Sequence, residues 1–259
     1  MKKSLILTAL LAAIVLWGGV LAGCSDDSSS GSSSSGSKIA ADSLPAPVGD
    51  NPFSVKNYIC MTEATDGSYK YNEYVVIDTN ERTITYCDYV TKEINSDSAM
   101  IKYTYNGTNK TITAAFYKMP IPSDTDKFTI FFKESFKDIA ERGGDTNDAF
   151  DDAAEKYDGE WKLVNRNELI TWYEDFISKR AYDVGISVYT ELYGTNISKT
   201  EIEKTIREAC DESIAEIKED FDDLFSIKYT MNYTVDNGII KFYGIDSKEE
   251  TETFTPENN

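Results

Sequence analysis

The sequence predicts an α+β protein, in which an antiparallel meander or barrel-like sheet of seven or eight strands carries a helical insertion. Apolar and polar residues alternate with a period of two before residue 119 and again after residue 226, as expected for strands with one buried face. Between these two blocks, apolar residues recur every three or four positions, as in amphipathic helices.

The first block predicts five strands. Its clearest segment places Ile112, Ala114 and Phe116 in alternation with the more polar side of the strand. Asp66-Gly67 and Asn106-Gly107 supply residues that favour tight turns. The expected strands cover about 55–63, 70–78, 82–91, 98–106 and 110–118.

The central block, about residues 126–224, predicts four helical stretches. Gly143-Gly144 marks the end of the first, and Gly185 is a candidate break within the third. The last has the most regular apolar stripe and begins at Ser198 or Thr200. The expected helices cover about 128–139, 145–157, 168–193 and 200–224.

Strands return over residues 226–255. Alternation from Ile227 to Thr234 is followed by Asn237-Gly238, which favours a type I′ hairpin turn because both of its central residues need positive φ. The chain then returns over Ile239–Tyr243, and a weaker last strand is expected over Thr251–Thr255.

The N-terminus has the pattern of a secretory signal peptide. Lys2 and Lys3 precede an apolar run that ends with Leu21-Ala22-Gly23-Cys24. Those last four residues resemble the lipobox of bacterial membrane lipoproteins. The resemblance implies cleavage before Cys24, attachment of lipid such as palmitate to its thiol, and acylation of the new amino terminus. An uncleaved transmembrane helix is the alternative, but the run is shorter than the roughly 20 residues that a span needs.

This organisation predicts a signal peptide over residues 1–23, a flexible linker rich in Ser and Gly over 24–50, and a single α+β domain over 51–255. A linker of this composition reaches roughly 25–30 Å from its anchor. We therefore expect a protein of the bacterial cell envelope, held to the membrane by acylated Cys24. The outer membrane or cell surface is favoured, and the periplasmic face is left open.

Composition excludes several classes of function. The net charge is −19, and removal of Lys2 and Lys3 with the signal peptide makes it −21, so a nucleic-acid partner is not expected. The chain has no histidine, which excludes Ser-His-Asp and Cys-His catalysis and imidazole metal sites. We expect no cofactor and no enzymatic activity. A hydrolase using carboxylates is the least favoured hypothesis, because 45 acidic residues offer no basis for choosing a pair.

No metal site is expected either. The acidic cluster at residues 145–152 lacks the fifth ligand and the sixth-position Gly of a calcium-binding EF-hand loop, where Ala149 and Phe150 stand instead. A capped helix start explains these acids.

Three cysteines follow Cys24, namely Cys60, Cys87 and Cys210. The first two fall on strands that we expect to lie two apart in the meander, nearly 10 Å from one another. A disulfide requires Cα atoms within about 7 Å, so buried thiols are expected and a Cys60–Cys87 bridge is the alternative.

The predicted function is binding of a small apolar ligand or sugar in the concavity of the sheet, by the inward-facing residues Ile112, Phe116, Tyr229 and Tyr233. Gly159-Glu160-Trp161 resembles the Gly-x-Trp signature of lipocalins, barrel proteins that hold small apolar molecules. In that family the motif lies on the first strand with its Trp at the closed end of the barrel, whereas here it lies in mid-chain. The alternative is a structural or protein-interaction lipoprotein with an envelope protein as partner and no small ligand.

Overall fold

The computed structural model describes residues 39–63, 70–144, 148–194, 196–244 and 250–257, so the lipobox lies outside the described residues. The region predicted as a single domain consists of two compact units. The barrel unit contains the described residues up to Pro120 and those from Asp222 onward, and the helical unit contains Ile121–Phe221. Within the described residues, no helix combines the length and the hydropathy needed to cross a membrane.

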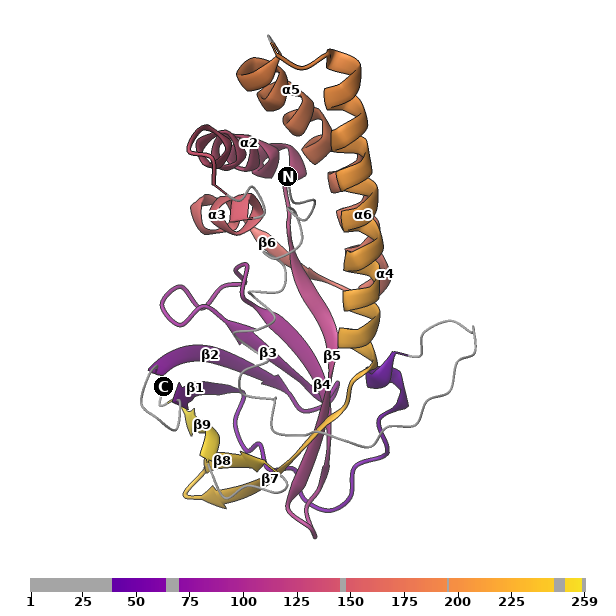
Figure 1. The fold of residues 1–259 in the computed structure, drawn as a ribbon. Coiled ribbons are helices and arrows are strands. Elements are labelled where there is room, and N and C mark those ends of the chain that lie inside the picture. The colour runs from indigo at the N-terminus through magenta and orange to yellow at the C-terminus, as the bar shows by residue number, and fades with distance from the viewer. Residues whose placement is uncertain (1–38, 64–69, 145–147, 195, 245–249, 258–259) are drawn as a thin grey trace. The chain divides into compact units, whose positions relative to one another are not determined.

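The barrel unit is a closed, eight-stranded, antiparallel up-and-down barrel, which confirms the predicted antiparallel meander and decides between an open and a barrel-like sheet in favour of the barrel (Figure 1). Its strands follow one another in the order β4-β3-β2-β1-β9-β8-β7-β5, and β5 pairs with β4 to complete the circle. The strands are β1 (Asn57–Glu63), β2 (Lys70–Asp78), β3 (Thr83–Cys87), β4 (Ala99–Asn106), β5 (Thr111–Pro122), β7 (Tyr229–Asp236), β8 (Ile239–Gly244) and β9 (Glu250–Pro256).

The register of the strands determines which side chains face the interior. Directly paired residues share a face, so Val75 and Tyr86 point inward together, and Ile77 and Ile84 do the same. The resulting core cluster lies inside the barrel and consists of Phe53, Tyr58, Cys60, Val75, Ile77, Ile84, Tyr86, Tyr103, Ile112, Ala114, Tyr233, Ile240, Phe242 and Phe254.

Two connections show why the strands end where they do. The β7–β8 turn has positive φ at Asn237 (51°) and Gly238 (81°), as the predicted type I′ turn requires. Strand β3 ends at Cys87, four residues earlier than expected. It ends there because the Asp88 carboxylate accepts hydrogen bonds from the backbone N–H groups of Val90 (2.9 Å) and Thr91 (2.7 Å) and closes a turn.

The cysteines are free and buried, as the sequence predicted. Cys60 pairs with Glu73 and faces the interior, whereas Cys87 pairs with Tyr74 on the outer face of the barrel. Because the two side chains point to opposite faces, no Cys60–Cys87 disulfide forms.

The folded chain begins earlier than predicted. Ala40–Ser43 forms a short 3₁₀-helix, η1, in which Ala40 and Ala41 are buried against Ala115 on the outer face of β5. The sequence predicts a flexible linker up to residue 50, because Ser and Gly dominate the preceding stretch. Residues 39–44 instead pack on the barrel, since the small side chains of Ala40 and Ala41 allow close contact with the strand, whereas residues 45–50 are exposed.

The helical unit contains α2 (Thr125–Glu141), α3 (Ala149–Lys156), β6 (Trp161–Val164), α4 (Arg166–Asp175), a π-helical segment η3 (Phe176–Ala181), α5 (Tyr182–Tyr193) and most of α6 (Lys199–Ser226). Strand β6 was not expected. The predicted break at Gly185 does not occur. The glycine lies within α5 because α6 passes close by, where an added Cβ would come within 3.1 Å of Ile206.

Aromatic rings form the core of the helical unit. Phe128 of α2 is fully buried. Its ring lies 5.1–6.1 Å from the rings of Phe150, Tyr157, Trp161, Trp172 and Phe176. Trp161 of the Gly-x-Trp tripeptide therefore packs in the helical unit on β6.

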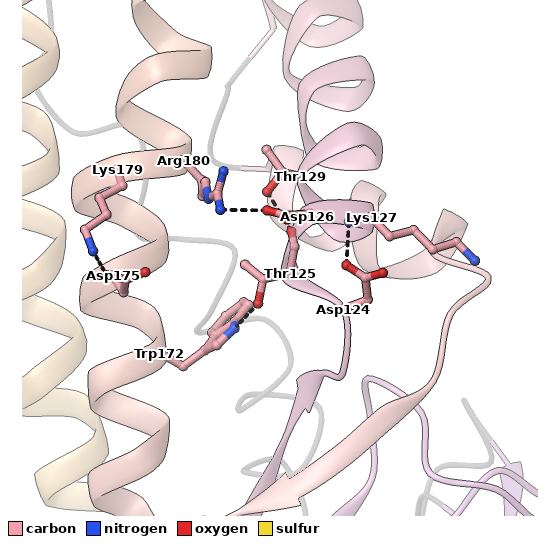
Figure 2. Close-up of polar contacts among 9 residues, drawn as sticks. All are labelled: Asp124, Thr125, Asp126, Lys127, Thr129, Trp172, Asp175, Lys179 and Arg180. Atoms are coloured by element: carbon pink, nitrogen blue, oxygen red, sulfur yellow. Dashed lines mark hydrogen bonds and ion pairs between the residues drawn. The ribbon is translucent and has the colours of Figure 1, made fainter.

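Polar contacts hold the first turn of α2 (Figure 2). The Asp124 carboxylate accepts a hydrogen bond from the Lys127 backbone N–H (2.9 Å), the usual N-cap contact. The indole N–H of Trp172 donates to the Thr125 hydroxyl (2.8 Å), and Arg180 pairs with Asp126 (2.6 Å). These contacts join α2 to α4 and η3.

We predict that Phe128→Ala destabilises the helical unit by about 3–5 kcal/mol, because it removes the ring at the centre of the aromatic core. Ile130→Ala, on the same helix and 60% exposed, should change the stability by less than about 0.5 kcal/mol. Both tryptophans of the described chain, Trp161 and Trp172, lie in this unit, so urea unfolding followed by tryptophan fluorescence measures it. Equal effects of the two substitutions would contradict this assignment of the core.

Candidate functional site

The two ends of the barrel differ in chemistry. One end, called the plugged end because Phe53 fills it, carries the turns at residues 79–82, 107–110 and 237–238. The segment before β1 also lies at this end. The acidic end, named for Glu73 and Glu252, lies where β1 ends and where β2, β7 and β9 begin. Inward-facing residues of the plugged end, such as Ile77 and Ile240, are buried. Glu73, Tyr229 and Glu252 at the acidic end are partly exposed.

Phe53 fills the plugged end. It precedes β1 and is only 4% exposed. Its ring centroid lies 5.8 Å from that of Tyr58, 5.1 Å from Tyr103 and 6.0 Å from Phe254. Such tilted and edge-to-face pairs stabilise an aromatic core. This half of the interior is therefore packed with the chain's own side chains.

The four residues predicted to line a ligand site all face the interior, but they fall in two groups. Ile112 and Tyr233 belong to the packed core cluster. Phe116 and Tyr229 lie toward the acidic end, with ring centroids 6.1 Å apart in an edge-to-face arrangement. The sequence pattern identified the inward faces of β5 and β7, but it could not show that Phe53 occupies one end.

The acidic end contains a pair of inward-facing carboxyl groups. Strand β1 lies between the strands that carry them, with Cys60 opposite Glu73 and Thr62 opposite Glu252. Phe242 pairs with Glu252 from the other side. Register alone thus directs two acidic side chains into a largely apolar barrel.

The pKa values of both carboxyl groups are raised from 4.5. Burial, followed by repulsion from Glu252 and Asp97, raises the pKa of Glu73 to about 8. Burial raises the pKa of Glu252 to about 7, against the lowering effect of a hydrogen bond from Tyr86. Both carboxyl groups therefore keep their protons to a higher pH than an exposed glutamate does, and the pair is partly protonated near neutral pH.

The surroundings of the pair contain no compensating positive charge on the neighbouring strands. None of the described residues that face inward from β9, β1, β2 and β3 is basic. Cys60 lies between the two acids, and burial and both carboxylates raise the pKa of its thiol well above 9.0. This thiol is consequently protonated and a poor nucleophile at neutral pH.

This arrangement can hold a polar group beside an apolar one. A protonated carboxyl donates a hydrogen bond and an ionised one accepts it, so a pair that is partly protonated can do both. Phe116 and Tyr229 offer ring faces and edges to an apolar body. Ligand sites commonly combine apolar walls with a few polar groups whose pKa values are perturbed.

The sequence does contain a signal for these two acids. Glu73 occupies the same phase of β2 as Val75 and Ile77, and Glu252 the same phase of β9 as Phe254. A carboxylate in the apolar phase of a strand costs free energy and is therefore a candidate for function.

No cluster of three or more metal-binding side chains of the His, Cys, Asp and Glu types occurs within the described ranges. Of the acids first considered for calcium, Asp152 forms an ion pair with Lys156 (2.5 Å), and residues 145–147 lie outside those ranges. Comparison with known proteins found no matching family model, no matching curated protein and no matching solved structure.

We predict that the carboxyl pair makes the barrel less stable as the pH rises from about 4.5 to about 8. The unfolded chain loses these protons near pH 4.5, whereas the folded chain retains them until pH 7–8, so ionisation favours unfolding over this interval. Glu73→Gln should therefore stabilise the barrel at pH 8.5 by on the order of 2 kcal/mol and have little effect at pH 5.

The measurement is urea unfolding of wild type and variant at pH 5, 7 and 8.5, followed by circular dichroism. Glu134→Gln, on the exposed face of α2, makes the same charge change outside the barrel and should show no such pH dependence. A Glu73→Gln effect of equal size at every pH would show that the pair titrates normally.

Proposed function

We propose that this chain is a non-catalytic lipoprotein of the bacterial cell envelope that binds a small apolar ligand or sugar inside its barrel, at the acidic end. The observation that supports this most is the partial exposure of Glu73, Tyr229 and Glu252, whose positions on the strands face the interior of a closed barrel. Two carboxyl groups that face inward beside strands whose described inward-facing residues include no basic one are costly to a folded core, which makes them candidates for function.

In this proposal the apolar part of the ligand packs against Phe116 and Tyr229, as in a lipocalin-like barrel. Its polar group exchanges hydrogen bonds with Glu73 and Glu252, which replace the water that the carboxyl groups lose on burial. In this proposal the ligand enters and leaves at the acidic end, where the inward-facing side chains are partly exposed.

The proposed ligand should survive gentle purification of the protein from its source membrane. Native mass spectrometry of the full chain should show an adduct of small-molecule mass, beyond any covalent lipid, that is released on denaturation. Phe116→Ala should decrease the adduct at least tenfold by removing a ring from the site, and Val90→Ala, in an exposed loop, should leave it unchanged. Absence of any adduct in the wild type would contradict ligand binding.

The proposed anchor has a separate test. Cells that express the full chain should incorporate radiolabelled palmitate into it, and the mature chain should begin at Cys24. Cys24→Ser should abolish both the labelling and the cleavage, because the lipid is attached to the thiol. Cys210→Ser, in the helical unit, is the matched control and should leave both unchanged.

A structural or protein-interaction lipoprotein is the alternative function. The packing of the plugged end by Phe53 and the exposure of Val90 (82%) beside Tyr89 (44%) favour it. A chain that carries no ligand but retains an envelope protein after mild cross-linking would support this alternative.

The pair of raised carboxyl pKa values is also compatible with acid–base hydrolysis. Conversion of the ligand to product, abolished by both Glu73→Gln and Glu252→Gln, would establish an enzyme. The same ligand recovered intact would favour binding.

A further inference from the structure

The segment that carries Phe53 is separate from the sheet of the barrel. Strand β1 is fully paired, with β2 on one side and β9 on the other. The eight strands therefore pair in a closed circle that does not include residues 44–55. Phe53 is an added occupant of the interior rather than part of its wall.

This segment is fixed at both of its ends. Upstream, Ala40 and Ala41 pack on Ala115, and the Lys228 ammonium donates to the Ser43 carbonyl (3.1 Å). Downstream, the Ile77 backbone N–H donates to the Lys56 carbonyl (2.7 Å) where β1 begins. The residues between these points form a single connecting loop outside the eight paired strands.

The contacts that hold the middle of the segment are few. Val48 forms a single bridge with Asn106, in which its N–H donates to Tyr105 (2.9 Å) and its carbonyl accepts from Gly107 (2.7 Å). The Asn51 amide donates to the Tyr103 hydroxyl (3.1 Å). The backbone N–H groups of Ser54 and Val55 donate to the Tyr58 hydroxyl (2.9 and 3.3 Å).

The outer side of the segment faces water. Val48 is 52% exposed and Val55 is 40% exposed, whereas Pro52 and Phe53 are buried. Only Pro52 and Phe53 would leave a buried position if the loop moved outward. Proteins open locally in short segments without global unfolding.

We propose that residues 44–56 form a hinged strap that opens and closes the plugged end of the barrel, with Phe53 as its removable stopper. Opening exposes the rings of Tyr58, Tyr103 and Phe254 and creates a space that a small apolar molecule of about one aromatic ring fits. The strap is thus a second gate to the interior, at the end opposite the carboxyl pair. Its opening does not require the ligand proposed at the acidic end, so the two ideas are tested independently.

The test measures hydrogen exchange of the full chain. The backbone amides of Ser54 and Val55 report the strap, and those of β1, such as Ile59, report the barrel. If the strap opens on its own, the strap amides exchange at least 100-fold faster than the β1 amides. Exchange at the β1 rate would show that the strap opens only when the barrel unfolds, and would overturn the proposal.

A reversible disulfide between the strap and β4, called the lock, distinguishes opening of the whole strap from small fluctuations within it. Val48 and Asn106 are bridge partners, so Val48→Cys with Asn106→Cys places two thiols for a disulfide. The oxidised variant should slow exchange at Ser54 and Val55 at least tenfold, and reduction should restore the wild-type rate. Equal rates in the oxidised and reduced forms would overturn the proposal.

Two further readouts control the experiment. Phe53→Ala removes the stopper and should speed strap exchange at least tenfold without changing β1. The oxidised lock should leave exchange at Ile59 unchanged, because β1 is paired on both sides by other strands. If Phe53→Ala does not fold, the exchange rates of the oxidised and reduced lock variant still test the proposal.

Discussion

Closure of the barrel is the constraint on which the rest of the structure depends. Once β4 pairs with β5, every strand has two neighbours, and each residue is committed either to the interior or to the outside. A carboxyl group on the inward phase is then held among apolar side chains and cannot move to the outer face of the barrel. The raised pKa values of Glu73 and Glu252 are a direct result of this commitment, because their strands cannot shift by one residue without reversing the whole core.

The interior is consequently divided along its axis. Phe53 and the tyrosines around it fill one end, and their hydroxyl groups are partly used to bind the segment that closes it. The other end keeps its polar groups and remains partly exposed. The division gives the barrel one end filled by its own side chains and one end whose polar side chains are partly exposed.

The sequence predicted much of the fold, and its limits have physical causes. Strict alternation identified the strands, and Asn237-Gly238 fixed the last hairpin, because both signals are local. Strand β6 was missed because four residues are too short for a periodic pattern. The position of Phe53 in the core was missed because the residue lies before β1, outside any strand, where no alternation of apolar and polar residues indicates which side chains face inward. Glu73 and Glu252 were missed among the 45 acidic residues, although their phase with Val75 and Phe254 distinguishes them from acids on the outer face.

The absence of histidine gives the carboxyl pair a consequence for the energetics of binding. In most proteins histidine side chains exchange protons with the buffer near neutrality, and they obscure any proton that a ligand displaces. Here the described side chains with pKa values near 7 and 8 are two glutamates inside one barrel. A molecule that enters beside them changes their ionisation, so the heat of its binding depends on the ionisation enthalpy of the buffer, and calorimetry in two buffers counts the protons exchanged within the barrel.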